Sequence, residues 1–238
     1  MALLKGYIPL FREILKTPKI FSGPVLMFGY QDIIGDTIPA EFRYRGLKEA
    51  LEAKGIGPIT TVDIFDDRAD WRADFNLPIS AEHKEQYQTV IDIGCLEHLF
   101  NTATCLKNCM DMVQVGGFYV LETPVHGCFM HGFHTFNPDM ITGTLELNGF
   151  SILMKRYTSF FGAPIKNAPN ARNSFMWIVA QKKTRVEPFN VMQQEYWKEP
   201  MRVRLGLGNY PRLLHFLDII TPPICIPLAL KIRAFLKW

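Results

Sequence analysis

The sequence predicts an α/β fold in which a mostly parallel sheet is covered by helices on both faces. Between residues 25 and 122, short apolar runs alternate with segments of helical periodicity, which is typical of parallel sheets. The apolar runs are continuous, as expected for strands that are buried on both faces. The 238 residues are 48% apolar and 21% charged, so the chain is long and apolar enough to form a substantial core.

The expected strands are apolar or β-branched runs separated by helical segments and turns. The last two follow each other with no helix between them, which predicts an antiparallel hairpin. The loop between these two, residues 158–173, is long enough to cover a site. The six runs are 25–29, 59–65, 87–93, 118–123, 150–157 and 174–183.

Three helices are expected in the same part of the chain. The first spans 39–55 and places Tyr44 and Leu47 on one face. The second covers 99–113, where apolar residues recur at spacings of three and four and a pair of glycines follows. The third covers 137–148, because an asparagine followed by a proline is a strong signal for a helix start.

Ligands of parallel sheets bind at the carboxyl ends of the strands, so the residues just after each strand are the candidates for a site. These segments are 29–32, 63–67, 93–98 and 122–126. The first follows an apolar strand that ends in Gly29, as in a nucleotide-binding turn. Here, however, larger residues fill a loop that usually contains several glycines.

Four motifs occur in order at these positions. They are Asp63 at the end of the second strand, the segment DFNLP at 74–78, LEH at 96–98 and VQVGG at 113–117. This series resembles the class I S-adenosylmethionine (SAM)-dependent methyltransferases, in particular their type 11 group. The resemblance covers about residues 24–183.

The resemblance implies a Rossmann-like, doubly wound sheet of seven strands, mostly parallel, with an antiparallel C-terminal hairpin. It also implies SAM as the cofactor. Asp63 is then expected to hold the ribose hydroxyls, because a carboxylate accepts hydrogen bonds from both. Asp74 and Phe75 are expected near the adenine, and Ile93 and Gly94 to touch the cofactor through their backbone. The alternative is that both aspartates are ordinary strand-end or turn residues.

The first glycine motif departs from the family pattern. Met27 stands where the family has an acid, Gly29 is kept, and Gln31 replaces a second glycine. Gln31 either crowds the cofactor or contributes an amide to it, and Asp32 is a nearby acid that partly compensates. Cofactor is expected over Gly29, where the backbone has no Cβ.

The loop after the fourth expected strand contains three histidines. His126 and His134 are candidates to take a proton from an attacking hydroxyl or amine. The alternative is that they pack against neighbouring phenylalanines. Their spacing with His131 is not that of a known compact ligand set, so no metal is expected. Glu97 is expected to be structural, and His98 to form part of the pocket wall.

The chain is expected to have an N-terminal amphipathic segment, 1–23, a methyltransferase-like domain, 24–183, and a basic, apolar C-terminal extension, 184–238. The extension either packs on the domain or contacts a membrane surface peripherally through 213–238. Its prolines argue against a membrane-spanning helix. Deletion of 198–238 is expected to leave a folded domain with weaker membrane or partner association.

No convincing signal peptide is visible, so a cytoplasmic protein with reduced thiols is expected. The net charge of +3 gives no reason to expect a nucleic-acid partner. The function that the motifs favour is methyl transfer from SAM to a small molecule or to a glycan or lipid-linked acceptor. The alternative is a non-catalytic binding or scaffold module of the same fold. An NAD-dependent enzyme is disfavoured because GxGxxG is absent.

Overall fold

The computed structural model describes residues 2–166 and 173–193. Residues 1–190 belong to one compact unit. A second unit begins at Val191, and most of it lies beyond the described residues. The predicted membrane contact through 213–238 and the effect of deleting 198–238 therefore fall outside the described residues. Within the described ranges, no helix combines the length and the apolar character needed to cross a bilayer.

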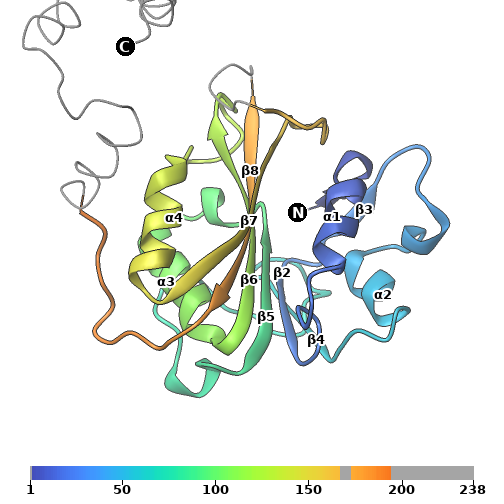
Figure 1. Ribbon diagram of the computed structural model, residues 1–238. Coiled ribbons are helices and arrows are strands. Elements are labelled where there is room, and N and C mark those ends of the chain that lie inside the picture. The colour runs from blue at the N-terminus through green and yellow to red at the C-terminus, as the bar shows by residue number, and fades with distance from the viewer. Residues whose placement is uncertain (1, 167–172, 194–238) are drawn as a thin grey trace, which may run out of the picture. The chain divides into compact units, whose positions relative to one another are not determined.

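A six-stranded sheet forms the centre of the first unit (Figure 1). Its strand order is β4-β2-β5-β6-β8-β7. The first four strands are mutually parallel, whereas β8 runs antiparallel to both of its neighbours, so the predicted hairpin is confirmed. The bounds are β2 (Val25–Phe28), β4 (Ile59–Val62), β5 (Tyr87–Ile93), β6 (Val113–His126), β7 (Phe150–Thr158) and β8 (Ser174–Lys182).

The seventh strand of the expected sheet is reduced to a single bridge beside β4. Trp71 pairs with Val62 in parallel, and its backbone N–H donates to the carbonyl of Thr61 at 3.0 Å. The pairing does not extend further, because the backbone N–H of Thr61 donates to the side-chain carboxylate of Asp70 at 2.8 Å instead of to a neighbouring strand. Residues 66–74 are rich in charge and contain no β-branched residue, which disfavours a regular strand.

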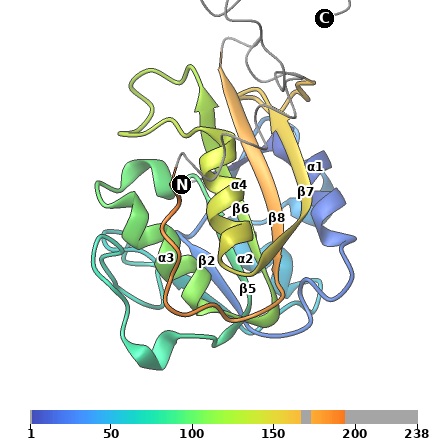
Figure 2. The same ribbon diagram turned by 60° about the vertical axis from the view of Figure 1, so that its left-hand side comes forward.

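Helices cover both faces of the sheet, as predicted (Figures 1 and 2). On one face, α3 (Thr102–Met112) and α4 (Pro138–Leu147) pack over the core that contains Leu106 and Ile141. On the other face, α1 (Ile8–Leu15) and α2 (Leu47–Glu52) pack over a second core. The predicted start of α4 is confirmed, since the side chain of Asn137 accepts the N–H of Asp139 at 2.8 Å.

The helix expected over 39–55 is shorter than predicted. It consists of the 3₁₀ turn η2 (Ala40–Phe42) and of α2, and Tyr44 between them is 42% exposed. The chain around Gly46 is extended because it pairs with the loop after β2: Asp32 bridges to Gly46, and Leu47 N–H donates to the carbonyl of Gln31. These tertiary contacts override the local helical pattern.

The N-terminal residues belong to the same compact unit. β1 (Ala2–Leu4) pairs in parallel with β3 (Asp32–Ile34), and η1 (Lys5–Tyr7) leads into α1. The segment is held by apolar side chains that are fully or almost fully buried against the sheet. The N-terminal segment therefore packs beside the loop that follows β2, since β1 pairs with β3 in that loop. These buried residues are Leu3, Tyr7, Ile8, Phe11 and Ile14.

Candidate functional site

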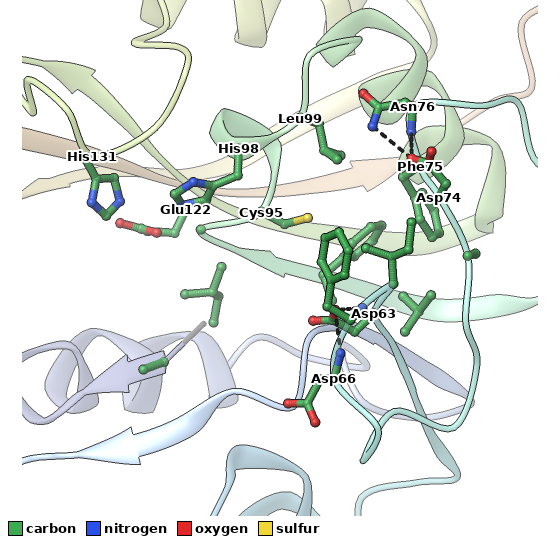
Figure 3. A pocket seen from close by; sticks show the side chains of 18 of the residues that line it. Asp63, Asp66, Asp74, Phe75, Asn76, Cys95, His98, Leu99, Glu122 and His131 are labelled. Carbon is green, nitrogen blue, oxygen red and sulfur yellow. Dashed lines mark hydrogen bonds between the residues drawn. The ribbon is translucent and has the colours of Figure 1, made fainter.

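A cavity of about 860 Å³ lies at the carboxyl ends of the parallel strands (Figure 3). Phe28 of β2, Val62 of β4, Ile93 of β5 and Glu122 of β6 all line it. Residues after these strands complete the walls, together with the N-terminal segment and the start of the loop after β7. This is the edge at which α/β sheets bind ligands. The volume is suited to a small molecule of cofactor size.

Asp63 stands at the cavity just after β4, as predicted. Its Oδ1 accepts the backbone N–H groups of Phe65 at 2.8 Å and Asp66 at 3.1 Å, which fixes the direction of the carboxylate. Its Oδ2 accepts no hydrogen bond from the described residues. The carboxylate is therefore held in place with acceptor capacity left for a ligand.

Asp74 and Phe75 also line the cavity, close to Asp63 (Figure 3). Asp74 Oδ1 accepts the backbone N–H of Asn76 at 2.9 Å and its side-chain amide at 2.8 Å. Phe75 is 4% exposed, and its ring packs edge-on against Phe28 with a centroid distance of 4.5 Å. The aromatic wall is thus anchored in the core.

Ile93 and Gly94 form the part of the cavity at the end of β5. Gly94 has φ +75°, a conformation that favours glycine. A Cβ at this position would lie 3.5 Å from Glu97 Oε1 and 3.6 Å from Glu122 Oε2. Because glycine has no Cβ, the space between the Gly94 backbone and the carboxylates of Glu97 and Glu122 stays open.

The structure does not bring Gly29, Gln31 or Asp32 into the cavity lining. Gln31 is fully buried, and its Nε2 donates to the carbonyls of Phe28 at 2.8 Å and Ile93 at 2.9 Å. Asp32 forms an ion pair with Arg68 at 2.8 Å. Gln31 therefore acts as a connection between strands, and neither its side chain nor that of Asp32 lines the cavity.

Three buried carboxylates lie near the end of β5 and β6. Asp92 and Glu97 are fully buried, and Glu122 is 3% exposed. Burial, with a smaller contribution from Glu97, raises the pKa of Asp92 to about 7 and that of Glu122 well above its usual range. No lysine or arginine of the described residues forms an ion pair with any of the three. Burial without a lysine or arginine partner in this part of the chain thus favours the neutral form of Asp92 and Glu122.

His126 and His134 lie outside the cavity lining. His126 is exposed near the end of β6, and His134 stacks on Phe136 with a centroid distance of 5.8 Å. Two other histidines line the cavity instead: His98 follows β5, and His131 comes from the loop after β6, with ring centroids 5.3 Å apart. Figure 3 shows both rings beside Glu122.

Several lining residues were not assigned to a site from the sequence, among them Glu122, His131 and Tyr7. Glu122 lies in a strand-end segment that the sequence did single out, so its position was recognisable although its role was not. His131 is brought in by the path of its loop. Tyr7 lines the cavity and donates from its hydroxyl to the carbonyl of Phe160 at 2.8 Å. No pattern in the sequence indicates that the N-terminal segment reaches the site.

Comparison with solved structures gives the fold. The Haloferax volcanii complex of the Trm112 methyltransferase activator with its proposed methyltransferase matches 77% of this chain and 92% of the matched chain, at 11% identity and a TM-score of 0.50. The fold is that of the class I methyltransferases. The predicted fold class is therefore confirmed, with six strands in the sheet.

Two further structures are similar at lower scores. A SAM-dependent methyltransferase from Archaeoglobus fulgidus matches 73% of this chain and 92% of its own, with 15% identity and a TM-score of 0.48. The glycopeptide N-methyltransferase MtfA, in complex with sinefungin, matches 75% and 94%, with 12% identity and a TM-score of 0.47. MtfA is also known in complexes with SAM and with S-adenosylhomocysteine.

No family model matches the sequence, and no curated protein matches it. The resemblance to the type 11 group of the methyltransferases therefore stays a prediction.

Proposed function

We propose that this protein is a SAM-dependent methyltransferase that acts on a small molecule or on a glycan or lipid-linked acceptor. The observation that carries the proposal is the assembly of Asp63, Asp74, Phe75, Ile93 and Gly94 around one cavity. These residues are far apart in the sequence and were selected because they resemble the cofactor-binding positions of that family. Their convergence at the carboxyl edge of a methyltransferase fold supports a common role in binding the cofactor.

In this proposal, different residues contact the ribose and the adenine of the cofactor. Asp63 would accept the ribose hydroxyls through a carboxylate that local N–H groups already orient. Phe75 would offer a fixed aromatic wall to the adenine, and Asp74 would lie beside it. SAM supplies both the methyl group and the leaving group, so the protein needs to align the reactants and exclude water.

The acceptor side of the cavity would be the part that holds His98, Glu122 and His131. An acceptor that attacks as a hydroxyl or amine must lose a proton, and these side chains line the space where it would stand. His126 and His134, the sequence-based candidates, are less well placed.

Equilibrium titration of the full chain with SAM tests the proposal. We expect one SAM to bind per chain, with S-adenosylhomocysteine competing for the same site and NAD giving no binding. Transfer of a labelled methyl group from SAM to separate small-molecule, glycan and lipid fractions would then identify the acceptor class. Absence of binding at millimolar SAM would contradict the proposal.

A non-catalytic module of the same fold is the second candidate. It is favoured by the loop after β2, where Gln31 replaces a glycine and turns into the core, and where Gly29 does not line the cavity. A module of this kind would show no methyl transfer to any fraction, whether or not it binds SAM. The labelled-methyl assay therefore separates the two candidates.

A further inference from the structure

Glu97, His98 and His131 bring three potential metal-ligand atoms to one place. One carboxylate oxygen and one ring nitrogen from each histidine all lie within 4.8 Å of one another. The Nε2 atom of His131 is 3.5 Å from Glu97 Oε1, and that of His98 is 4.0 Å from the same oxygen. Both histidines line the cavity described above.

The carboxylate of Glu97 is the least expected part of this group. Its side chain is fully buried. Oε2 accepts a hydrogen bond from the hydroxyl of Thr123 at 3.3 Å, but Oε1 has no hydrogen-bond partner within the described part of the chain. No lysine or arginine of that part pairs with it. A buried carboxylate with a free oxygen is costly unless a cation compensates its charge.

The backbone holds the ligand positions together although His131 is far from Glu97 in the sequence. The carbonyl oxygen of Glu97 accepts the N–H groups of Phe133 at 2.9 Å and His134 at 3.2 Å. Gly132 permits this approach, since a Cβ there would lie 2.9 Å from that carbonyl oxygen. The backbone of the loop is therefore fixed onto the turn that carries Glu97 and His98.

We propose that Glu97, His98 and His131 bind one divalent transition-metal ion of the zinc type at the wall of the cavity. Two imidazoles and a carboxylate form a donor set that suits such an ion, with a fourth position open to the cavity. Bonds of about 2.0–2.2 Å in tetrahedral geometry place neighbouring ligand atoms roughly 3.5 Å apart. The separation of Glu97 and His131 already has this value, that of Glu97 and His98 is 4.0 Å, and all three ligand atoms lie within 4.8 Å of one another.

Thr123 would serve as the outer partner of the site. Its hydroxyl donates to Oε2 of Glu97, the oxygen other than the one nearest the two histidines in the measured pairs, which orients the carboxylate. A metal ion bound here would lie next to the place where an acceptor would stand, and could coordinate an oxygen or nitrogen of that acceptor. The inference concerns metal binding and does not depend on methyl transfer.

A second group, Asp92 with Cys105 and Cys109, is a weaker candidate among the described residues. Both oxygens of Asp92 already accept hydrogen bonds, from the N–H of Cys95 at 3.0 Å and the hydroxyl of Tyr119 at 3.2 Å. All three side chains are fully buried. The group therefore lacks both a free acceptor and an open coordination position, and Cys109→Ser provides a control for it.

The test is a titration of the tag-free, EDTA-treated full chain with Zn²⁺ by calorimetry, and with Co²⁺ by absorption spectroscopy. We expect one ion per chain and a Co²⁺ spectrum without thiolate charge transfer. Glu97→Gln, His98→Ala and His131→Ala should each weaken Zn²⁺ binding about tenfold or more, and Thr123→Val should weaken it less. His126→Ala and Cys109→Ser should bind as the wild type does.

The following outcomes would overturn the proposal. Absence of stoichiometric Zn²⁺ binding by the wild type would do so directly. Unchanged binding in all three ligand variants, or loss in Cys109→Ser or His126→Ala, would place the ion elsewhere. Glu97→Gln keeps the shape of the side chain, so a wild-type melting temperature in the absence of metal distinguishes a lost ligand from a lost fold. Because metal binding is read without SAM, failure here leaves the proposed function untouched.

Discussion

The side-chain amide of Gln31 donates a hydrogen bond to the carbonyl oxygen of Ile93 at 2.9 Å and so connects the ends of β2 and β5. The same nitrogen donates to the carbonyl of Phe28 at 2.8 Å. Gln31 adopts φ +55°, which is unusual for a residue with a side chain. The loop after β2, which resembles a cofactor-binding turn, thus contains a side chain that links the carboxyl ends of two central strands.

Gln31→Gly is expected to destabilise the protein by about 1–3 kcal/mol. Glycine would relieve the left-handed backbone at this position, but two buried hydrogen bonds would be lost and a void would remain. Urea unfolding of the variant and of wild type measures the difference. Gln86→Gly, at an exposed position, is the control and should change stability less. A Gln31→Gly variant at least as stable as wild type would contradict this role.

The position of Asp63 could be predicted because Asp63 directly follows a strand of the sheet, whereas Asp74 and Phe75 were expected at the cavity only from the resemblance of the DFNLP segment to the methyltransferase motif. The carboxyl ends of parallel strands meet at one edge, so residues that follow different strands come together whatever the loops do. The contact of Gln31 with Ile93 could not be predicted in this way. It joins residues that are far apart in the sequence, and its geometry depends on the packing of a loop.

The strands of the sheet show the same difference between features that the sequence predicts and features that depend on tertiary packing. The apolar runs of β2 and β5 predict their strands because burial on both faces requires continuous apolar residues. The bridge at Trp71 was not predicted, since a single pair beside β4 leaves no periodic pattern. The N-terminal segment was recognised as amphipathic, but its apolar residues do not indicate which surface they cover. Its contribution to the cavity, including Tyr7, therefore appears only in the structure.

Asp63→Ala is expected to weaken SAM binding at least about tenfold, because it removes charge-assisted hydrogen bonds to the ribose. Calorimetric titration of the variant with SAM measures this. Asp67→Ala is the matched control, since Asp67 lies in the same turn but does not line the cavity. If the two variants bind SAM equally well, the ribose is held elsewhere.

Gly94→Ala is expected to weaken SAM binding and to destabilise the fold by about 1–2 kcal/mol. The loss of stability comes from the left-handed backbone, and the loss of affinity from a methyl group placed between Glu97 and Glu122. Gly116→Ala separates the two effects, because Gly116 has φ +87° with nothing within 4 Å of its added Cβ. It should lose similar stability and keep its SAM affinity. Wild-type affinity in Gly94→Ala would show that the cofactor does not approach this position.

The stability of the protein is expected to fall as the pH rises from 5 to 8, in a buffer that contains EDTA. Burial raises the pKa of Asp92 from its ordinary value of 3.8 to about 7. In this range the unfolded chain has released the proton of Asp92, whereas the folded protein still holds it until the pH passes about 7. The folded state therefore binds more protons, and the free energy of unfolding decreases with rising pH.

The contribution of Asp92 to this decrease is on the order of 2–3 kcal/mol. Asp92→Asn should reduce the decrease by about that amount, because an amide cannot ionise and still fits the position. Glu122, whose pKa burial also raises, acts in the same direction, so part of the slope should remain. Urea unfolding at pH 5 and pH 8 of wild type, Asp92→Asn and the exposed control Asp67→Asn measures the slopes. Equal slopes in all three would mean that Asp92 does not hold its proton in the folded protein over this pH range.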